Sequence, residues 1–314
     1  MATKKTTKKV TTAKSAPKKA AAKATETTVT RNVSAPASRK KGRIDTSLPG
    51  NLINIILAEA IGTFVLTLVA ISAASYFMLP LYVGITLAII IMAIGAISGA
   101  HINPAVTFGL WSMRKLKTVL VPFYWAAQFL GAMAAVVLLG ALSGGAFAVH
   151  FDQFLGFSWG IFAMELVGTA VFIFGLAAVI NRADIKQTGK AFGIGMSLAI
   201  GLVVSGALFS YVQSNALAKH QEKQASVQTD TAEVKEGERT YPREVYVGGA
   251  TLNPAVALAV TEKTDSQLQG SSATPQKDEK AYTRLSLEVI AATFIGAALG
   301  GNLFLLVNYR SRQS

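Results

Sequence analysis

Two copies of the tripeptide Asn-Pro-Ala, one in each half of an apolar chain, constrain the possible folds more than any other feature. Asn is a favoured N-cap, and Pro fits the first helical turn because its missing N–H would be unpaired there anyway. The helix predicted after the first copy ends before Arg114, well short of the roughly 20 apolar residues that span a bilayer. Half-helices at membrane depth are tolerated only where they line a cavity or are buried in protein. The two motifs are Asn103, Pro104 and Ala105, and then Asn253, Pro254 and Ala255.

The composition indicates a polytopic membrane protein. Of the 314 residues, 51% are hydrophobic and only 15% are charged, and the mean hydropathy is +0.42. Such values exceed those of ordinary soluble domains. There is no cysteine, and the three histidines lie far apart, so we expect no metal site. The sequence also has no nucleophile–base set and no phosphate-binding loop, so we expect neither an enzyme nor a cofactor.

The net charge of +13 is concentrated at the N-terminus. Before Ile44 the chain carries 13 Lys and Arg residues and a single acidic residue, Glu26. Residues 1–46 are rich in Lys, Ala, Thr and Ser and are predicted to form a disordered cytoplasmic tail. We expect this tail to contact anionic lipid headgroups. A nucleic-acid-binding arm is the less favoured alternative, because the tail has no aromatic residue for base stacking.

Six apolar runs are each near the length that a bilayer requires. Lysines and arginines follow the first half-helix and the fourth run, whereas residues 75–80 and 143–157 contain none. The positive-inside rule therefore places both termini in the cytoplasm of a protein that crosses the cell membrane several times. The predicted spans are 51–74, 81–97, 119–142, 157–180, 191–213 and 285–307.

The chain repeats itself within a channel domain that covers residues 47–314. The sequence around Glu59, Gly62 and Thr63 returns around Glu165, Gly168 and Thr169. Residues 127–132 likewise return as 292–297, and the glycines of these repeats are expected at helix crossings. Each copy, about 51–142 and about 157–307, holds three spans, so the second must be inverted in the membrane. The predicted fold is an all-α membrane protein with six transmembrane helices and two re-entrant half-helices that enter from opposite faces.

Two polar stretches lengthen the second copy. Residues 213–243 and 262–282 are mixed in charge and lack apolar periodicity. They are predicted to be flexible extracellular insertions. The sharper alternative is a lid over the mouth of the pathway, since long ordered loops are often functional.

Two half-helix N-termini that meet at the midplane would concentrate positive electrostatic potential in the middle of the bilayer. This potential opposes cations and lets neutral dipolar molecules pass. The side chains of Asn103 and Asn253 are expected to offer amide donors to a passing oxygen. The extended backbone before each motif is expected to offer carbonyl acceptors. These predicted pore carbonyls belong to Gly99, Ala100, His101, Gly249, Thr251 and Leu252.

Residues 52–307 resemble the aquaporin, or major intrinsic protein, family. The resemblance rests on the two motifs, on the run SGAH-x-NPAVT at residues 98–107, on the repeated Glu-x-x-Gly-Thr element, and on Ala-Gln-x-x-Gly-Ala at residues 127–132. It implies a homotetramer with one pore per subunit. It further implies permeation by water and, in some branches, by glycerol or other small neutral solutes.

The selectivity filter departs from the family pattern. The family places an Arg directly after the second motif, and this chain has Val256. By the resemblance, the other filter positions fall on Val83, Leu202 and Ala250, which makes the ring apolar. Ala257 stands where glycerol-conducting members carry Asp. We expect proton exclusion to depend on the half-helix dipoles alone, and the apolar ring to favour less polar solutes or to gate the pore by dewetting.

Three polar residues inside predicted spans need an explanation. Glu59 and Glu165 are costly at membrane depth and suit either a proton relay or the support of the re-entrant loops. The resemblance favours loop support, to which Gln128 would also contribute. His101 is expected to fix the loop rather than to act as a pH switch.

These features predict a passive transmembrane channel for water and/or other small neutral solutes. A facilitator of glycerol, small apolar solutes or gases is the nearest alternative. An ion-coupled secondary transporter is a reading from another class, and it would need a charged substrate site at the midplane. A third hypothesis is a membrane scaffold with a closed pore and a functional basic tail.

Overall fold

The computed structural model describes residues 47–143, 149–227, 239–268, 270 and 280–311. The chain divides into two units, Met1–Ile44 and Asp45–Ser314, and all described residues belong to the second. The predicted basic tail, residues 1–46, lies outside the described residues.

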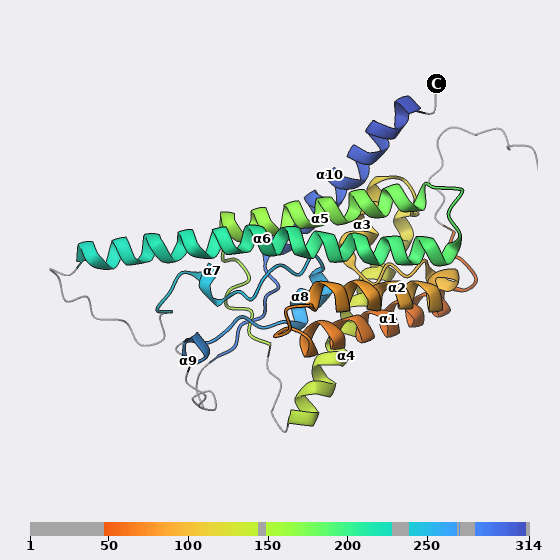
Figure 1. The fold of residues 1–314 in the computed structure, drawn as a ribbon. Coiled ribbons are helices and arrows are strands. Elements are labelled where there is room, and N and C mark those ends of the chain that lie inside the picture. Colours follow the sequence, from red (N-terminus) through yellow and green to blue (C-terminus); the bar gives the residue numbers. More distant parts are fainter. Residues whose placement is uncertain (1–46, 144–148, 228–238, 269, 271–279, 312–314) are drawn as a thin grey trace, which may run out of the picture. The chain divides into compact units, whose positions relative to one another are not determined.

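Six helices of the described part are long and apolar enough to cross a membrane, as predicted, so the chain is a multi-pass membrane protein (Figure 1). Two shorter helices, α3 (Pro104–Ser112) and α8 (Pro254–Ala259), begin at the prolines of the two motifs. Two single-turn helices are also present: α7 (Arg243–Tyr246) begins where the first polar stretch ends, and α9 (Asp265–Leu268) lies in the second. The six long helices are α1 (Leu52–Ser72), α2 (Leu79–Ser98), α4 (Val121–Ser143), α5 (Trp159–Ile180), α6 (Gln187–Val227) and α10 (Leu287–Ser311).

Helix α6 corrects the prediction for the first polar stretch. The sequence placed the end of the fifth span near residue 213 and a flexible loop after it. The helix instead continues to Val227 and is 41 residues long. Residues 207–227 contain neither Gly nor Pro, and nearly half of them are Ala, Gln, Lys or Glu, which are strong helix formers. Helix propensity therefore extends α6 where the apolar pattern ends; residues 228–238 are not described.

The two repeats pack their helices in the same way. Helix α1 packs against α4, and α5 packs against α10. A Cβ atom on Gly131 would overlap the carbonyl oxygen of Ala60, and one on Gly296 would overlap that of Leu166. These four residues occupy equivalent places in the two repeats. The predicted crossings at Gly131 and Gly296 are thus confirmed, and the two helix pairs cross at equivalent positions in the two repeats.

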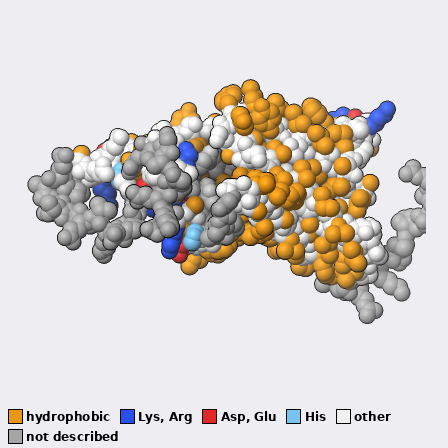
Figure 2. Space-filling view, turned by 90° about the horizontal axis from the view of Figure 1, so that it is seen from below, with side chains coloured by type: hydrophobic (Ala, Val, Ile, Leu, Met, Phe, Trp, Pro, Cys, Tyr) orange, Lys and Arg blue, Asp and Glu red, His pale blue; other side chains and the backbone are white. Residues whose placement is uncertain are grey.

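The bundle exposes apolar side chains on its outside. Ile53, Leu57 and Ile61 on α1 are all more than half exposed. Figure 2 shows hydrophobic side chains over most of the visible helical body, with charged side chains gathered toward its ends. In water such an apolar surface would promote aggregation, whereas in a bilayer it contacts lipid tails.

The polar segments at one end of the bundle form a connected structure, here called the polar cap (residues 149–158, 239–247, 260–268 and 280–286). Backbone hydrogen bonds join Thr283 N to His150 O over 3.0 Å and Lys263 N to Tyr246 O over 2.8 Å. A further bond runs from Arg284 N to Val260 O. Within the second polar stretch, Glu262 N also donates to Tyr282 O over 2.8 Å, so its two described ends are bonded to each other. The middle of the predicted flexible loop, residues 269 and 271–279, lies outside the described residues.

Candidate functional site

The two half-helices meet tip to tip. The side-chain amide nitrogen of Asn103 donates to the carbonyl of Leu252 over 2.8 Å. The amide nitrogen of Asn253 donates to the carbonyl of Ile102 over 3.1 Å. Each asparagine thus bonds to the residue directly before the other one, and both are nearly buried. The structure brings together the two motifs that the sequence placed 150 positions apart.

Each asparagine also caps its own half-helix, as predicted. The side-chain oxygen of Asn103 accepts from Ala105 N over 2.8 Å, and that of Asn253 accepts from Ala255 N over 3.0 Å. Both asparagines have extended backbone, and proline follows each as the first helical residue. One of the two amide N–H groups of each asparagine is used across the contact, which leaves one, rather than two, for a solute.

The loops before the motifs have a strained backbone. Ile102 and Leu252 lie at φ angles of 41° and 53°, and Ala100 at 49°. The left-handed region costs about 1–3 kcal/mol for a non-glycine residue and persists where the surroundings hold it. Among the predicted pore carbonyls, that of Leu252 already accepts the bond from Asn103. This carbonyl is therefore a structural acceptor, which the sequence did not indicate.

Glu59 holds the first of these loops. It is fully buried on α1, and its carboxylate accepts from the backbone N–H groups of His101 and Ile102 over 2.9 and 2.7 Å. The hydroxyl of Ser98 and the side-chain amide of Gln128 donate to it as well, over 2.6 and 2.9 Å. Four donors thus surround a buried carboxylate, as its burial requires.

Glu165 holds the second loop in the same manner. It is fully buried on α5 and accepts from Thr251 N and Leu252 N, each over 2.9 Å. The Thr251 hydroxyl donates over 3.2 Å. The fourth donor is Nη2 of Arg284, also at 3.2 Å. Because this guanidinium carries a full charge, the bond is an ion pair, unlike any described contact of Glu59.

His101 lies between the first loop and its half-helix. Its Nδ1 is 3.1 Å from the hydroxyl of Thr107, and its ring stacks on Tyr124 with 4.4 Å between centroids. Gln128 donates to the same hydroxyl of Thr107 over 3.0 Å. These contacts are of the loop-fixing kind that the sequence led us to expect.

The four predicted filter residues belong to one apolar cluster. Val83 on α2 and Val256 on α8 are buried members of it, with 7% and 6% of their surface exposed. Leu202 on α6 and Ala250 in the second loop pack against the same cluster and are partly buried. The structure thus brings the four side chains to one region, and their action as a filter stays a prediction.

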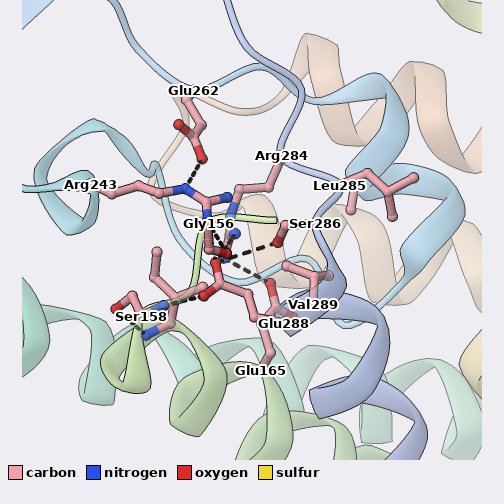
Figure 3. Close-up of polar contacts among 12 residues, drawn as sticks. Gly156, Ser158, Glu165, Arg243, Glu262, Arg284, Leu285, Ser286, Glu288 and Val289 are labelled. Atoms are coloured by element: carbon pink, nitrogen blue, oxygen red, sulfur yellow. Dashed lines mark hydrogen bonds and ion pairs between the residues drawn. The ribbon is translucent and has the colours of Figure 1, made fainter. Parts of the chain in front are cut away.

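The polar cap contains a buried ion-pair network that was not predicted from the sequence (Figure 3). Arg243 contacts Glu262 over 2.8 Å and Glu288 over 2.7 Å, and its Nη1 donates to the carbonyl of Gly156. Arg284 links the network to Glu165 and is only 1% exposed. One signal was available, because Arg284 and Glu288 stand four residues apart where the last span begins.

The charge of Arg284 reflects two opposing influences. Burial lowers the pKa of its guanidinium, and the carboxylate of Glu165 acts in the other direction. An arginine stays protonated in proteins because its ordinary pKa lies far above physiological pH. The side chain therefore provides a permanent positive charge next to the second loop.

Comparison with known proteins places this arrangement in a family. A model of the family described as "Major intrinsic protein" matches residues 45–214. Aquaporin NIP2-3 of Zea mays is 34% identical over 162 residues, which are 48% of this chain and 53% of that protein. Probable aquaporin TIP2-2 of Oryza sativa subsp. japonica is 33% identical over 178 residues, which are 52% of this chain and 70% of that protein.

The chain spans about half the length of the first of these relatives. The X-ray structure of the aquaglyceroporin from Plasmodium falciparum aligns with a TM-score of 0.48 and 18% identity, over 82% of this chain and 95% of that one. The family model covers more than half of the chain, including the first motif, Glu59, Gln128 and Glu165. The chain belongs to the major intrinsic protein family.

Proposed function

We propose that this chain forms a passive transmembrane channel for water and/or other small neutral solutes. The observation that carries the proposal is the pair of reciprocal bonds from Asn103 and Asn253 to the opposite loop. Family membership supports a channel for water or small solutes rather than an enzyme. A joint held by neutral amides and carbonyls suits neutral hydrogen-bonding solutes.

The opposition to cations comes, in this proposal, from the two half-helix N-termini. Both α3 and α8 direct their first turns toward the joint, where the aligned peptide dipoles of each half-helix concentrate positive potential. Helix α8 has only six residues, so we expect α3, with nine, to contribute the larger part. No Arg follows the second motif to strengthen this barrier.

The apolar ring of Val83, Leu202, Ala250 and Val256 is proposed as the filter. Their membership of one apolar region supports this assignment. An apolar constriction offers no donor to a solute and can gate by dewetting. The ring therefore favours the less polar of the small solutes, such as glycerol or dissolved gases, relative to a channel that has an arginine in this place.

The contacts of the two buried glutamates argue against ion-coupled transport. Glu59 and Glu165 each receive four hydrogen bonds from described residues. A substrate ion would have to displace backbone donors that also hold the loops. We therefore assign both glutamates, with Gln128, to the support of the pore loops.

Orientation and assembly follow the sequence and the family resemblance. We propose that both termini face the cytoplasm at the cell membrane, and that the basic residues before Ile44 contact anionic lipid headgroups. The polar cap then lies outside the cell. A homotetramer with one pore in each subunit is the proposed assembly.

A permeability panel tests the proposed function. Purified full-length chain is reconstituted into liposomes, and fluxes of water, glycerol, urea, hydrogen peroxide, ammonia and protons are compared with those of empty liposomes. We expect at least one neutral solute to pass without saturation and without dependence on an ion gradient. Saturable flux that follows an ion gradient would instead establish a coupled transporter.

A further inference from the structure

The four donors of Glu59 have counterparts around Glu165, with one exception. In both repeats the carboxylate receives the N–H groups of the two residues before the motif asparagine, and one hydroxyl. The fourth donor of Glu59 is Gln128, on the third span of its repeat. The residue of the second repeat that matches Gln128 is Thr293, in the parallel runs AAQFLGA and AATFIGA.

Thr293 does not act as that donor. Its hydroxyl donates to the carbonyls of Val289 and Ile290 on its own helix, over 2.8 and 3.2 Å. A threonine side chain is also shorter than a glutamine by two heavy atoms. The second repeat would therefore leave its loop-holding carboxylate one donor short, and a buried acceptor that lacks a partner is destabilising.

Arg284 supplies the missing donor from another place in the chain. It precedes α10, is 1% exposed, and reaches Glu165 with Nη2. Its Nε and Nη1 have no hydrogen-bond partner among the described residues. Only one of its donor atoms is thus used on Glu165, and one N–H group of a glutamine amide would satisfy the same oxygen.

We propose that Arg284 is a positioning residue of the pore, which replaces in the second repeat the glutamine that holds the first. It acts through Glu165 on the loop of Thr251 and Leu252, and hence on the carbonyl that accepts from Asn103. Through Glu288 and Arg243 the same residue also connects the pore loop to the polar cap. This assignment rests on the proposed channel function.

The internal repeat suggests an experiment in which a second substitution restores the donor that is lost with Arg284. The helix pairs of the two repeats cross at matching glycines, Gly131 and Gly296. We therefore expect position 293 to face Glu165 as position 128 faces Glu59. A glutamine at position 293 should therefore replace the donor that is lost with Arg284. We compare R284L, R284L/T293Q and R284L/T293L, because the two double variants differ in the donor at 293. R182L is the control, since Arg182 is an exposed arginine paired with Asp184 in the loop between α5 and α6.

Osmotic water permeability per folded protein in liposomes, and the unfolding temperature in detergent, are measured for each variant. We expect R284L to lower the permeability by about tenfold, since a charge-assisted bond to a buried carboxylate is lost. T293Q should restore at least half of it in the double variant, T293L should not, and R182L should match the wild type. Equal behaviour of R284L and wild type, or of the two double variants, would overturn the assignment.

Two readouts separate this assignment from the proposed function. If the wild type passes no solute above the level of empty liposomes, the channel proposal fails. The positioning role is then judged by unfolding temperature, which T293Q and not T293L must raise in the R284L background. If R284L does not fold, the folded yield of the two double variants is compared in the same way, and equal yields contradict the assignment.

Discussion

The side-chain amide of Asn103 donates a 2.8 Å hydrogen bond to the carbonyl of Leu252, a residue 149 positions later. The bond joins the tip of one half-helix to the loop that leads into the other. Its mirror image runs from Asn253 to Ile102. The contact between the half-helices is thus made by the two residues that also cap them, so each asparagine side chain both caps its own half-helix and bonds to the opposite loop.

This coupling predicts different costs for two substitutions of Asn103. N103S keeps a good N-cap and loses the bond to Leu252, so we expect the free energy of unfolding to fall by about 1 kcal/mol. N103A loses both the cap and the bond, so its free energy of unfolding should be about 2 kcal/mol lower than that of the wild type. Thermal unfolding in detergent measures both values. Equal stability of N103S and the wild type would show that the contact between the half-helices contributes nothing.

A second prediction concerns the crossing of α1 and α4. G131A places a methyl group against the carbonyl of Ala60, so we expect a loss of about 3 kcal/mol or more, or failure to fold. G206A is the matched control, because a Cβ there meets nothing within 4 Å. Alanine in place of an exposed helical glycine stabilises by up to about 1 kcal/mol. Folded yield and unfolding temperature are measured for both variants. If G131A matched G206A in both quantities, the close crossing of α1 and α4 at Gly131 would be contradicted.

A third prediction tests the apolar ring. V256R introduces a charge and several donors among Val83, Leu202 and Ala250, whereas V256L keeps the ring apolar. We expect V256R to lower the ratio of glycerol to water permeability on the order of tenfold, because the ring becomes narrower and more polar. V256L should leave the ratio near that of the wild type. A ratio that no substitution at 256 changes would remove this residue from the filter.

The polar cap yields a prediction for alkaline pH. Tyr246 is almost fully buried, and its hydroxyl donates to Asp265 over 2.6 Å. Burial, and then this hydrogen bond, raise the pKa of Tyr246 to about 12. The ordinary value is about 10, so the folded state favours the protonated form. The resulting stability is complete below about pH 10 and is lost as the pH rises toward 12.

The measurement is the unfolding temperature of the wild type and Y246F between pH 8 and 12. The wild type should be the more stable below pH 10, and the difference should shrink above it. Y211F serves as a control, because Tyr211 on α6 is 73% exposed. A difference between wild type and Y246F that stays constant up to pH 12 would contradict the raised pKa.

The parts of the fold that depend on local pattern could be predicted from the sequence. The spans followed from apolar runs of bilayer length, and the half-helices from Asn and Pro at their first positions. The inverted repeat followed from Glu59 and Glu165, which hold equivalent loops. These features were predictable because each is encoded within a few neighbouring residues.

The parts that depend on tertiary contact could not be predicted. The extension of α6 to Val227 is a separate case, because its largely polar sequence gave no apolar periodicity although its helix propensity favours a helix. Arg284 and Glu262 lie in polar sequence that is typical of a flexible loop, yet both are buried in ion pairs. A buried charge is stable only with its partner, and the partner of Arg284 lies 119 positions away.

The most direct test of the central claim is the simultaneous measurement of water and proton flux in liposomes that contain the full-length chain. Vesicle shrinkage reports water movement, and an enclosed pH-sensitive dye reports protons. The joined half-helix tips predict water permeability well above that of empty liposomes, without added proton leak. Proton entry that rises together with water flux, or the absence of flux above empty liposomes for water and for every other neutral solute of the panel, would contradict the account.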